Sequence, residues 1–331
     1  MIKMGIIGLG GIAGAHLLAY KRLSNVQVVA AADTSRESAR SYELIKDSNI
    51  KLYSDYADMI EKEELDAVDI CAPSYLHKEI SVYALERDLH VLCEKPMAIT
   101  SDDADKMVKA AKKSQKAFMC AQIIRFSRPY EHLRKIVESG ELGRPIQIFM
   151  SRLSKVPRWR SGSMNTDAGK NGGVMLDLSI HDVDYIYSVF GEPRAISGVY
   201  HKTSAENYND YISANLLYDG FAVTLNGGFY EADIEFSSEF HAIFEAGDVR
   251  LDRFGNLYQC GKPIEARDAV YPNELKGLNI ELTSCFIDEI RYFVECINAG
   301  KETPLALPES TAGGIRLAER IAESCLALNN P

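Results

Sequence analysis

The chain has 331 residues, of which 46% are hydrophobic and 25% are charged, and its formal net charge is -10. This balance is typical of a globular protein and excludes a disordered chain. The length suggests about two domains. Nucleic acid is not expected as a partner, because a phosphate backbone needs a basic surface. A local basic stretch at 106–116 has apolar residues at helical spacing, which indicates a solvated helix face.

The cysteines and the hydropathy of the chain indicate the cellular compartment in which the protein works. The seven cysteines are an odd number and include no Cys-x-x-Cys pair. Such cysteines act as small hydrophobic residues, so a reducing cytoplasm is expected. The amino terminus leads directly into a strand pattern rather than a signal peptide. No apolar run approaches the roughly 18–20 residues of a membrane span, so no membrane association is expected.

The first third of the chain alternates short apolar runs with helical patterns. The runs lack polar alternation, as a parallel sheet covered on both faces requires. They are Met1–Ile7, Val26–Ala32, Ala67–Ala72, His90–Cys93 and Ala117–Gln122. Helices are predicted over 15–23, after a capping box at 34–37, and from Ser101. The pattern predicts an α/β fold, with a doubly wound, Rossmann-type domain over residues 1–123.

Residues 124–331 predict a second domain of the α+β class with an open, largely antiparallel sheet. Helices are expected over 130–139 and 174–190, separated by a strand at 146–153 and a polar, Gly-rich loop at 156–173. Strands follow between residues 195 and 258, with hairpin turns at 219–220 and 246–248. Two amphipathic helices, at 282–297 and 315–325, close the chain. The last helix is a candidate to pack back on the first domain.

A Gly-x-Gly-x-x-Ala motif at residues 8–13 follows the first strand and opens a helix. Gly8 permits a tight turn, Gly10 lets the backbone approach a pyrophosphate, and the helix N-terminus offers free N–H groups. The next strand ends at Asp33, where an acid accepts hydrogen bonds from the ribose 2′-hydroxyl and repels a 2′-phosphate. The motif predicts dinucleotide binding, with NAD favoured over NADP. Arg36 keeps NADP open, because it is near enough in sequence to reach a 2′-phosphate.

Lys95 and Pro96 follow a predicted strand, and open α/β sheets bind ligands beyond the carboxyl ends of their strands. A lysine there can hold a substrate hydroxyl and stabilise a developing alkoxide. Asp177 and His181 are four residues apart in a helical pattern, so they share a face. A carboxylate beside an imidazole suits a general base. From spacing alone, a histidine satisfied in the core is the commoner interpretation.

A metal site is the other interpretation of this segment, because Asp177, His181, Asp182 and Asp184 carry hard ligand atoms. Asp182 lies off the face that Asp177 and Asp184 share, and no His-x-x-x-His or His-Glu-x-x-His motif supports the set. No metal is therefore expected.

Together these motifs resemble the Gfo/Idh/MocA family, the glucose-fructose oxidoreductase and inositol dehydrogenase group. The matching segments are IIGLGGIAGAH at 6–16, Asp33, APSYLH at 72–77, CEKPMAIT at 93–100, RF at 125–126 and GGVMLDLSIHDVDYIYSVFG at 172–191. The resemblance spans nearly the whole chain. It implies an NAD(P)-dependent oxidoreductase that transfers a hydride between nicotinamide and a hydroxyl-bearing carbon of a sugar or cyclic polyol.

The resemblance also assigns residues. Glu94 would contact the nicotinamide ribose, Lys95 would bind the reacting hydroxyl, and His181, with Asp177, would accept its proton. The full set assigned to the cofactor is Gly8, Gly10, Gly11, Ile12, Asp33, Arg36, Pro73, Ser74, Leu76, His77, Glu94 and Lys95. Weaker candidates for the substrate pocket are Arg125, Arg158, Trp159 and Asn171. Family members assemble through the open face of the C-terminal sheet, so a homodimer or homotetramer is expected.

The substrate and three alternative functions stay open. The segment DLSIHDVD resembles inositol dehydrogenases most, which favours a polyol ring, but the loop at 155–171 does not match those enzymes. Some relatives cleave glycosides by transient oxidation with NAD kept bound. Others are regulators that bind the dinucleotide as a signal. A scaffold with a vestigial cofactor domain is disfavoured by the complete glycine turn.

Overall fold

A computed structural model describes the whole chain except residues 36–40, 47, 157–171, 202–209, 272–281 and 328–331. The chain forms two compact units. The first comprises Met1–Ala98, Asp102–Phe126 and Asp268–Ala312, and the second comprises Ile99–Ser101, Ser127–Arg267 and Gly313–Pro331. The division after Phe126 lies close to the boundary predicted at 123/124, but a late segment of the chain returns to the first unit.

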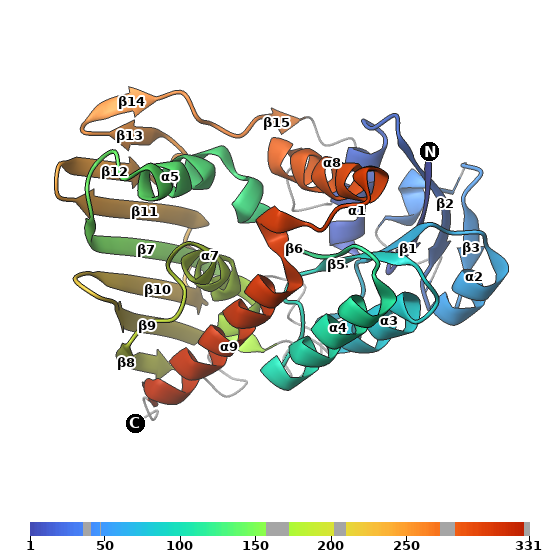
Figure 1. Ribbon diagram of the computed structural model, residues 1–331, viewed down its shortest axis with the longest axis horizontal. Coiled ribbons are helices and arrows are strands. Elements are labelled where there is room, and N and C mark those ends of the chain that lie inside the picture. The colour runs from blue at the N-terminus through green and yellow to red at the C-terminus, as the bar shows by residue number, and fades with distance from the viewer. Residues whose placement is uncertain (36–40, 47, 157–171, 202–209, 272–281, 328–331) are drawn as a thin grey trace. The chain divides into compact units, whose positions relative to one another are not determined.

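The first unit is built on a six-stranded sheet with the order β3-β2-β1-β4-β5-β6. Every neighbouring pair is parallel. Helices α1 and α8 lie on one face and α3 and α4 on the other (Figure 1). This order and layering are those of a Rossmann sheet, so the predicted doubly wound fold is confirmed.

The elements of this unit are as follows. The strands are β1 (Ile2–Ile7), β2 (Val26–Ala32), β3 (Lys51–Tyr53), β4 (Ala67–Ile70), β5 (His90–Glu94), β6 (Phe118–Ala121), and a separate pair, β15 (Val270–Tyr271) and β16 (Leu282–Thr283). The helices are α1 (Gly11–Tyr20), α2 (Tyr56–Lys62), α3 (His77–Leu85), α4 (Ser101–Ser114) and α8 (Ser284–Ala299), with short 3-10 turns η2 (Tyr42–Leu44), η3 (Ser74–Leu76), η4 (Ile123–Phe126) and η7 (Pro304–Ala306).

Helix α8 is the element that returns to the first unit. Its apolar residues Phe286, Ile290 and Phe293 are buried in the same core cluster as Leu17 and Leu18 of α1. The last helix, α9 (Pro308–Ser324), groups with the second unit from Gly313 onward. The penultimate helix therefore packs with the Rossmann unit, because its apolar stripe completes the core that α1 leaves open.

One predicted helix start differs from the structure, and a second lies outside the described residues. Helix α1 begins at Gly11, directly on the glycine turn, four residues before the predicted start. The capping box at 34–37 extends into residues outside the described part of the chain, and the next described element is the 3-10 turn η2. The helix start at Ser101 is confirmed, with Asp102 and Asp103 in the first turn of α4, where negative charge is favourable.

The second unit contains a nine-stranded mixed sheet with the order β14-β13-β12-β11-β7-β10-β9-β8-β17. Neighbours are antiparallel except for β7 with β10 and β8 with β17, which are parallel. The predicted hairpins at 219–220 and 246–248 join β9 to β10 and β11 to β12. The expected open, largely antiparallel sheet is therefore confirmed.

The strands of this sheet are β7 (Pro145–Lys155), β8 (Ala195–His201), β9 (Asp210–Leu217), β10 (Ala222–Tyr230), β11 (Ser237–Phe244), β12 (Gly247–Leu251), β13 (Leu257–Gln259), β14 (Lys262–Ile264) and β17 (Leu326–Ala327). The helices of the unit are α5 (Arg128–Ser139), a π-helical turn η6 (Met175–Ser179), α7 (Ile180–Phe190) and most of α9.

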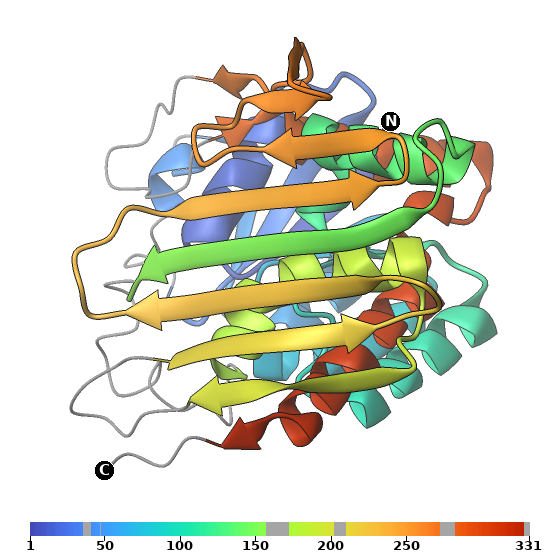
Figure 2. The same cartoon turned by 90° about the vertical axis from the view of Figure 1, so that its left-hand side faces the viewer.

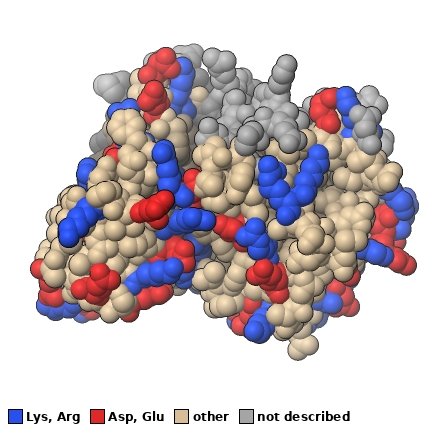
Figure 3. All heavy atoms as spheres, turned by 90° about the horizontal axis from the view of Figure 1, so that it is seen from above, with Lys and Arg blue, Asp and Glu red and all other residues tan. Residues whose placement is uncertain are grey.

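One face of the nine-stranded sheet carries α5, α7 and α9, and Figure 2 shows the other face turned toward the viewer. Side chains alternate accordingly along β7: Ile148 and Met150 are buried under the helices, whereas Phe149 between them is 38% exposed. Acidic and basic side chains are interspersed on the surface seen in Figure 3. Among the described residues, no helix is long and apolar enough to cross a membrane.

Candidate functional site

The glycine turn between β1 and α1 has the geometry of an anion-binding loop. Gly8 has φ +91°, and a Cβ there would lie 2.7 Å from the carbonyl oxygen of Cys71, so only glycine fits. A Cβ on Gly10 would meet no atom within 4 Å. Gly10 is also the N-cap of α1 and supplies no side-chain hydrogen bond to its free N–H groups. An open, uncapped helix N-terminus fits the pyrophosphate of a dinucleotide.

Asp33, directly after β2, is fixed against this turn. One carboxylate oxygen accepts the N–H of Leu9 at 2.7 Å, and the other accepts the N–H of Ser35 at 2.7 Å. The acid therefore lies at the glycine turn, as the sequence predicts for a ribose ligand. Gly11 and Ile12 form the first turn of α1. Arg36 lies outside the described residues.

The loop after β4 holds the next group of predicted cofactor residues. Pro73 precedes the 3-10 turn η3, which contains Ser74 and Leu76, and His77 begins α3. The His77 ring is buried, and its two nitrogens lie 2.8 Å from the carbonyl oxygens of Pro96 and Ala72. Burial lowers the pKa of His77. His77 thus ties the β4 loop to the turn that follows β5.

Glu94 and Lys95 lie at the carboxyl end of β5, where the sequence predicted them. Glu94 ends the strand and is only 7% exposed. One of its carboxylate oxygens accepts the backbone N–H of Lys95 at 2.9 Å. The Lys95–Pro96 peptide bond that follows is cis. The carboxylate is therefore held in one orientation at the strand end.

Sequence reasoning missed a set of buried polar residues behind Glu94. His16 of α1 lies 2.7 Å from Asp69 of β4 and 3.1 Å from Glu94, and all three are buried. The available signal was Asp69 itself, a charged residue inside an otherwise apolar strand. Gln122, after β6, is also buried, and neither polar atom of its amide has a hydrogen-bond partner among the described residues.

The segment that carries Asp177 and His181 begins at a pair of left-handed glycines. Gly172 and Gly173 have φ +70° and +64°, and the N–H of Val174 donates to a carboxylate oxygen of Asp210 at 2.8 Å. Asp177 then lies in the π-helical turn η6, and His181 in the first turn of α7. The predicted helix over 174–190 is confirmed, with the difference that its first part is π-helical. Such turns are frequent at functional sites.

Asp182, directly after His181, is engaged in a buried ion pair. The guanidinium of Arg152 on β7 contacts both carboxylate oxygens, at 2.8 and 2.9 Å. The hydroxyl of Tyr130 lies 3.3 Å from the same carboxylate. Asp182 therefore anchors the start of α7 to the sheet, and its oxygens are occupied by Arg152 rather than placed for a metal.

The remaining substrate candidates are placed as follows. Arg125 is buried, and its guanidinium donates to the carbonyl oxygen of Leu305 at 3.1 Å and to Ser310 at 3.2 Å. Two guanidinium nitrogens of Arg125 are therefore used to anchor the segment around η7. Arg158, Trp159 and Asn171 lie outside the described residues.

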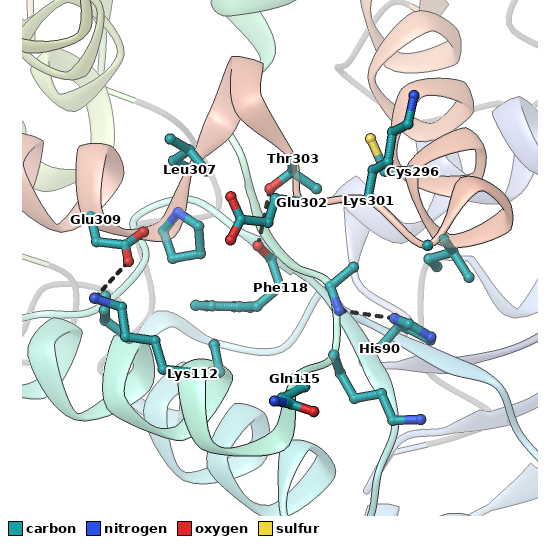
Figure 4. Close-up of a pocket in the computed structure, with 17 residues that line it drawn as sticks. His90, Lys112, Gln115, Phe118, Cys296, Lys301, Glu302, Thr303, Leu307 and Glu309 are labelled. Atoms are coloured by element: carbon teal, nitrogen blue, oxygen red, sulfur yellow. Dashed lines mark hydrogen bonds and ion pairs between the residues drawn. The ribbon is translucent and has the colours of Figure 1, made fainter.

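A pocket of about 440 Å³ lies elsewhere in the first unit (Figure 4). It is lined by His90 and Phe118, which begin β5 and β6, and by an ion pair of 2.8 Å between Lys112 and Glu309. Strands rise about 3.3 Å per residue, so Glu94 at the far end of β5 is remote from it. The pocket is therefore distinct from the predicted cofactor site.

These features define a class: a Rossmann-type dinucleotide-binding protein with a second, α+β unit. Residues 2–122 match the model described as oxidoreductase family, NAD-binding Rossmann fold, and residues 130–250 match the GFO/IDH/MocA C-terminal domain. The chain therefore belongs to the GFO/IDH/MocA family of NAD-binding oxidoreductases, and the resemblance stated from its motifs is confirmed.

Individual relatives agree with this assignment. The chain is 27% identical to the uncharacterized oxidoreductase YrbE of Bacillus subtilis, covering 100% of this chain and 96% of YrbE. It is 28% identical to myo-inositol 2-dehydrogenase of Thermotoga maritima, covering 58% of this chain and 55% of that protein. The match to this dehydrogenase thus spans about half of its length. The fold is similar to that of myo-inositol 2-dehydrogenase from Lactobacillus plantarum, with a TM-score of 0.78, 24% identity and coverage of 98% and 96%.

Proposed function

We propose that this protein is an NAD-dependent dehydrogenase that oxidises a hydroxyl-bearing ring carbon of a sugar or cyclic polyol. The observation that carries the proposal is the Glu94–Lys95 pair at the carboxyl end of β5, in the same unit as a glycine turn that fits NAD. Ligands of open α/β sheets bind at this end. The names of the dehydrogenase relatives support the substrate class.

The proposed mechanism gives each residue one task. When bound, the nicotinamide of NAD supplies the hydride acceptor. Lys95 binds the substrate hydroxyl and stabilises negative charge on its oxygen. His181 accepts the hydroxyl proton, and Asp177 orients its imidazole. Glu94 binds the nicotinamide ribose, and Pro73, Ser74, Leu76 and His77 form the loop beside it.

The choice of cofactor is proposed to rest on Asp33. Its carboxylate is fixed by the backbone N–H groups of Leu9 and Ser35. A fixed negative charge at this position accepts the ribose 2′-hydroxyl and repels a 2′-phosphate, so NAD is preferred to NADP. Gly10, Gly11 and Ile12 are proposed to hold the pyrophosphate.

The substrate is proposed to be a polyol or sugar ring, with inositols favoured by the resemblance of segment 177–184 to inositol dehydrogenases. Arg125, Arg158, Trp159 and Asn171 stay the predicted contributors to its pocket. Arg158 and Arg160, which flank Trp159 in the sequence, would suit a substrate that carries a carboxylate or phosphate. We also propose that the enzyme works in the cytoplasm, since all seven cysteines are free and six are buried.

A homo-oligomer is proposed to form through the face of the nine-stranded sheet opposite α5, α7 and α9 (Figure 2). This face presents Phe149, the ring stack of Tyr211 and Tyr230, and a depression of about 400 Å³ between β7, β11 and β12. Phe149→Arg should therefore lower the molar mass measured by light scattering. Phe254→Arg, at an exposed turn, is the matched control. An unchanged mass in the Phe149 variant would contradict the assignment of this face.

The function is tested by measuring NADH formation with inositols, aldoses, amino sugars and uronic acids. On the best substrate, Lys95→Ala should lower kcat/KM by about 10²–10³-fold, the range for loss of one charge-stabilising donor. Lys116→Ala, a lysine at the amino end of β6, is the control. Full activity in the Lys95 variant would sink the proposed site. Aglycone release without net NADH would indicate the glycosidase alternative, and tight NAD binding without turnover would indicate a regulator.

A further inference from the structure

Helix α1 carries an ionisable side chain, His16, into the interior of the first unit. His16 and Asp69 have no exposed surface, and Glu94 is nearly as buried. The Nδ1 atom of His16 lies 2.7 Å from a carboxylate oxygen of Asp69, and Nε2 lies 3.1 Å from a carboxylate oxygen of Glu94. The imidazole thus bridges β4 to the strand end that carries Lys95.

Four further groups surround this bridge. The Tyr20 hydroxyl donates to Asp69 at 2.9 Å, and the Sγ atom of Cys71 lies 3.7 Å from His16. Glu289 of α8 is fully buried, with no hydrogen-bond partner for either oxygen among the described residues, and the ring of Phe286 lies 5.9 Å from the imidazole. Burial raises the pKa of Cys71 to about 12 and that of Glu289 well above its usual range. The thiol of Cys71 is therefore neutral near pH 7.

The two groups that contact the nitrogens of the imidazole most closely are the carboxyl groups of Asp69 and Glu94. A neutral imidazole has one N–H and one lone pair, so it would turn its lone pair toward one of the two carboxylates. An imidazolium donates to both. Burial opposes the charged form, but Asp69 and Cys71, through their charge and their hydrogen bonds to the ring, together raise the pKa of His16 well above its usual range.

We propose that His16 is a positioning residue: as an imidazolium between Asp69 and Glu94, it fixes the Glu94 carboxylate in the orientation that binds the cofactor. The second oxygen of Glu94 accepts the N–H of Lys95, so the same bridge also sets the backbone of Lys95. The inference rests on the proposed function in one respect, that Glu94 binds the nicotinamide ribose. It adds a residue from α1 that does not itself touch the cofactor.

The protonation state is tested on the cofactor-free protein. We expect ¹⁵N NMR of histidine-labelled protein to show one ring with protons on both nitrogens near pH 7 and upward, a signal that disappears in His16→Asn. This readout does not depend on turnover. A His16 ring that carries a single proton at that pH overturns the proposal.

Positioning is tested by calorimetric NAD binding to matched variants. In His16→Asn the amide nitrogen replaces Nδ1, and Glu94 loses its contact with the imidazole, so the Kd for NAD should rise about ten-fold, the usual scale for one charge-assisted hydrogen bond. His16→Gln reaches toward Glu94 and should recover most of the affinity. Tyr20→Phe removes a hydrogen bond to the same Asp69 oxygen that His16 contacts, but it leaves the contact between His16 and Glu94 in place, so the Kd should stay within about two-fold.

Three further outcomes decide the inference. Once a substrate is known, His16→Asn should raise KM for NAD more than it lowers kcat. The effect of Glu94→Gln should not add to that of His16→Asn, because the two act as one unit. Equal losses of affinity in His16→Asn and Tyr20→Phe would point to general loosening of the core and overturn the proposal.

If no sugar or polyol reacts, NMR and NAD binding still test the role of His16. Failure of this inference is therefore separable from failure of the proposed function.

Discussion

Gly227 of β10 lies so close to Ser179 that a Cβ on the glycine would be 2.0 Å from the serine Oγ. Ser179 is the last residue of the π-helical turn that holds Asp177, and His181 follows two residues later. The missing side chain on β10 therefore lets this turn rest directly on the sheet. The position of the predicted proton acceptor depends on that contact.

Gly227→Ala should therefore displace the turn and impair catalysis more than stability. We expect kcat to fall about ten-fold or more, because small misplacements of a catalytic group have large kinetic effects. Ser179→Ala removes the Oγ atom and leaves the nearest contact at the Ser179 Cβ, 3.2 Å from the new methyl. The double variant should then recover activity. Steady-state measurement of kcat for the single and double variants tests this explanation. A double variant as impaired as Gly227→Ala alone would contradict it.

The two glycines of the dinucleotide turn should respond differently to alanine. Among the described residues, a Cβ at Gly10 meets no atom within 4 Å, and the φ of −67° suits alanine, so the unfolding temperature of Gly10→Ala without cofactor should fall only slightly. The methyl would occupy the space expected for the pyrophosphate, so NAD should bind at least about ten-fold more weakly. Gly8→Ala should instead destabilise the protein, because its φ is +91° and the backbone of Cys71 is in the way. Thermal unfolding and calorimetry separate the two effects.

The features predicted correctly from sequence are those that neighbouring residues encode. The glycine turn, the apolar parallel strands and the Asp219–Gly220 hairpin each depend on a few consecutive residues, and each is confirmed. The placement of Lys95 after β5 follows in the same way from the strand pattern and the proline. Local signals of this kind fix element type and register without knowledge of distant partners.

What was missed depends on contacts between distant parts of the sequence. His16 meets partners 53 and 78 residues away, and no local pattern pairs them. The π-helical form of the turn at Asp177 accompanies its close contact with Gly227, on a strand some 50 residues later. The return of α8 to the first unit depends on an apolar face that fits α1. The helical periodicity of the sequence identifies this apolar face, but it does not show which element the face packs against.

Asp33→Asn should weaken the preference for NAD over NADP. The amide keeps an oxygen acceptor for only one of the two backbone N–H groups, of Leu9 or of Ser35, and it removes the charge that would repel a 2′-phosphate. We expect the ratio of Kd values for the two cofactors to change by about ten-fold in favour of NADP. Asp55→Asn, at the N-cap of α2, is the control. An unchanged ratio would assign cofactor choice to other residues.

Glu289 should make stability depend on pH in a way that its amide variant lacks. Burial raises the pKa of Glu289 in the folded protein well above the 4.5 of the unfolded chain. Above about pH 4.5 the unfolded chain releases this proton while the folded protein keeps it. The folded state therefore loses up to about 1.4 kcal/mol of stability per pH unit, until the folded pKa is passed. Glu289→Gln removes this loss because its side chain does not ionise.

The advantage of Glu289→Gln in unfolding temperature should thus be small near pH 5 and grow as the pH rises above it. About 1 kcal/mol moves Tm by roughly 2–4 °C in proteins somewhat smaller than this one. The two proteins differ in one titratable group only, so the difference between their pH profiles reports on this carboxyl. Glu295→Gln, exposed on the same helix, should show no such trend. A pH-independent difference would mean that Glu289 is ionised in the folded protein, with a cationic partner that the described contacts do not include. The charge at the His16 bridge would then have to be reassigned as well.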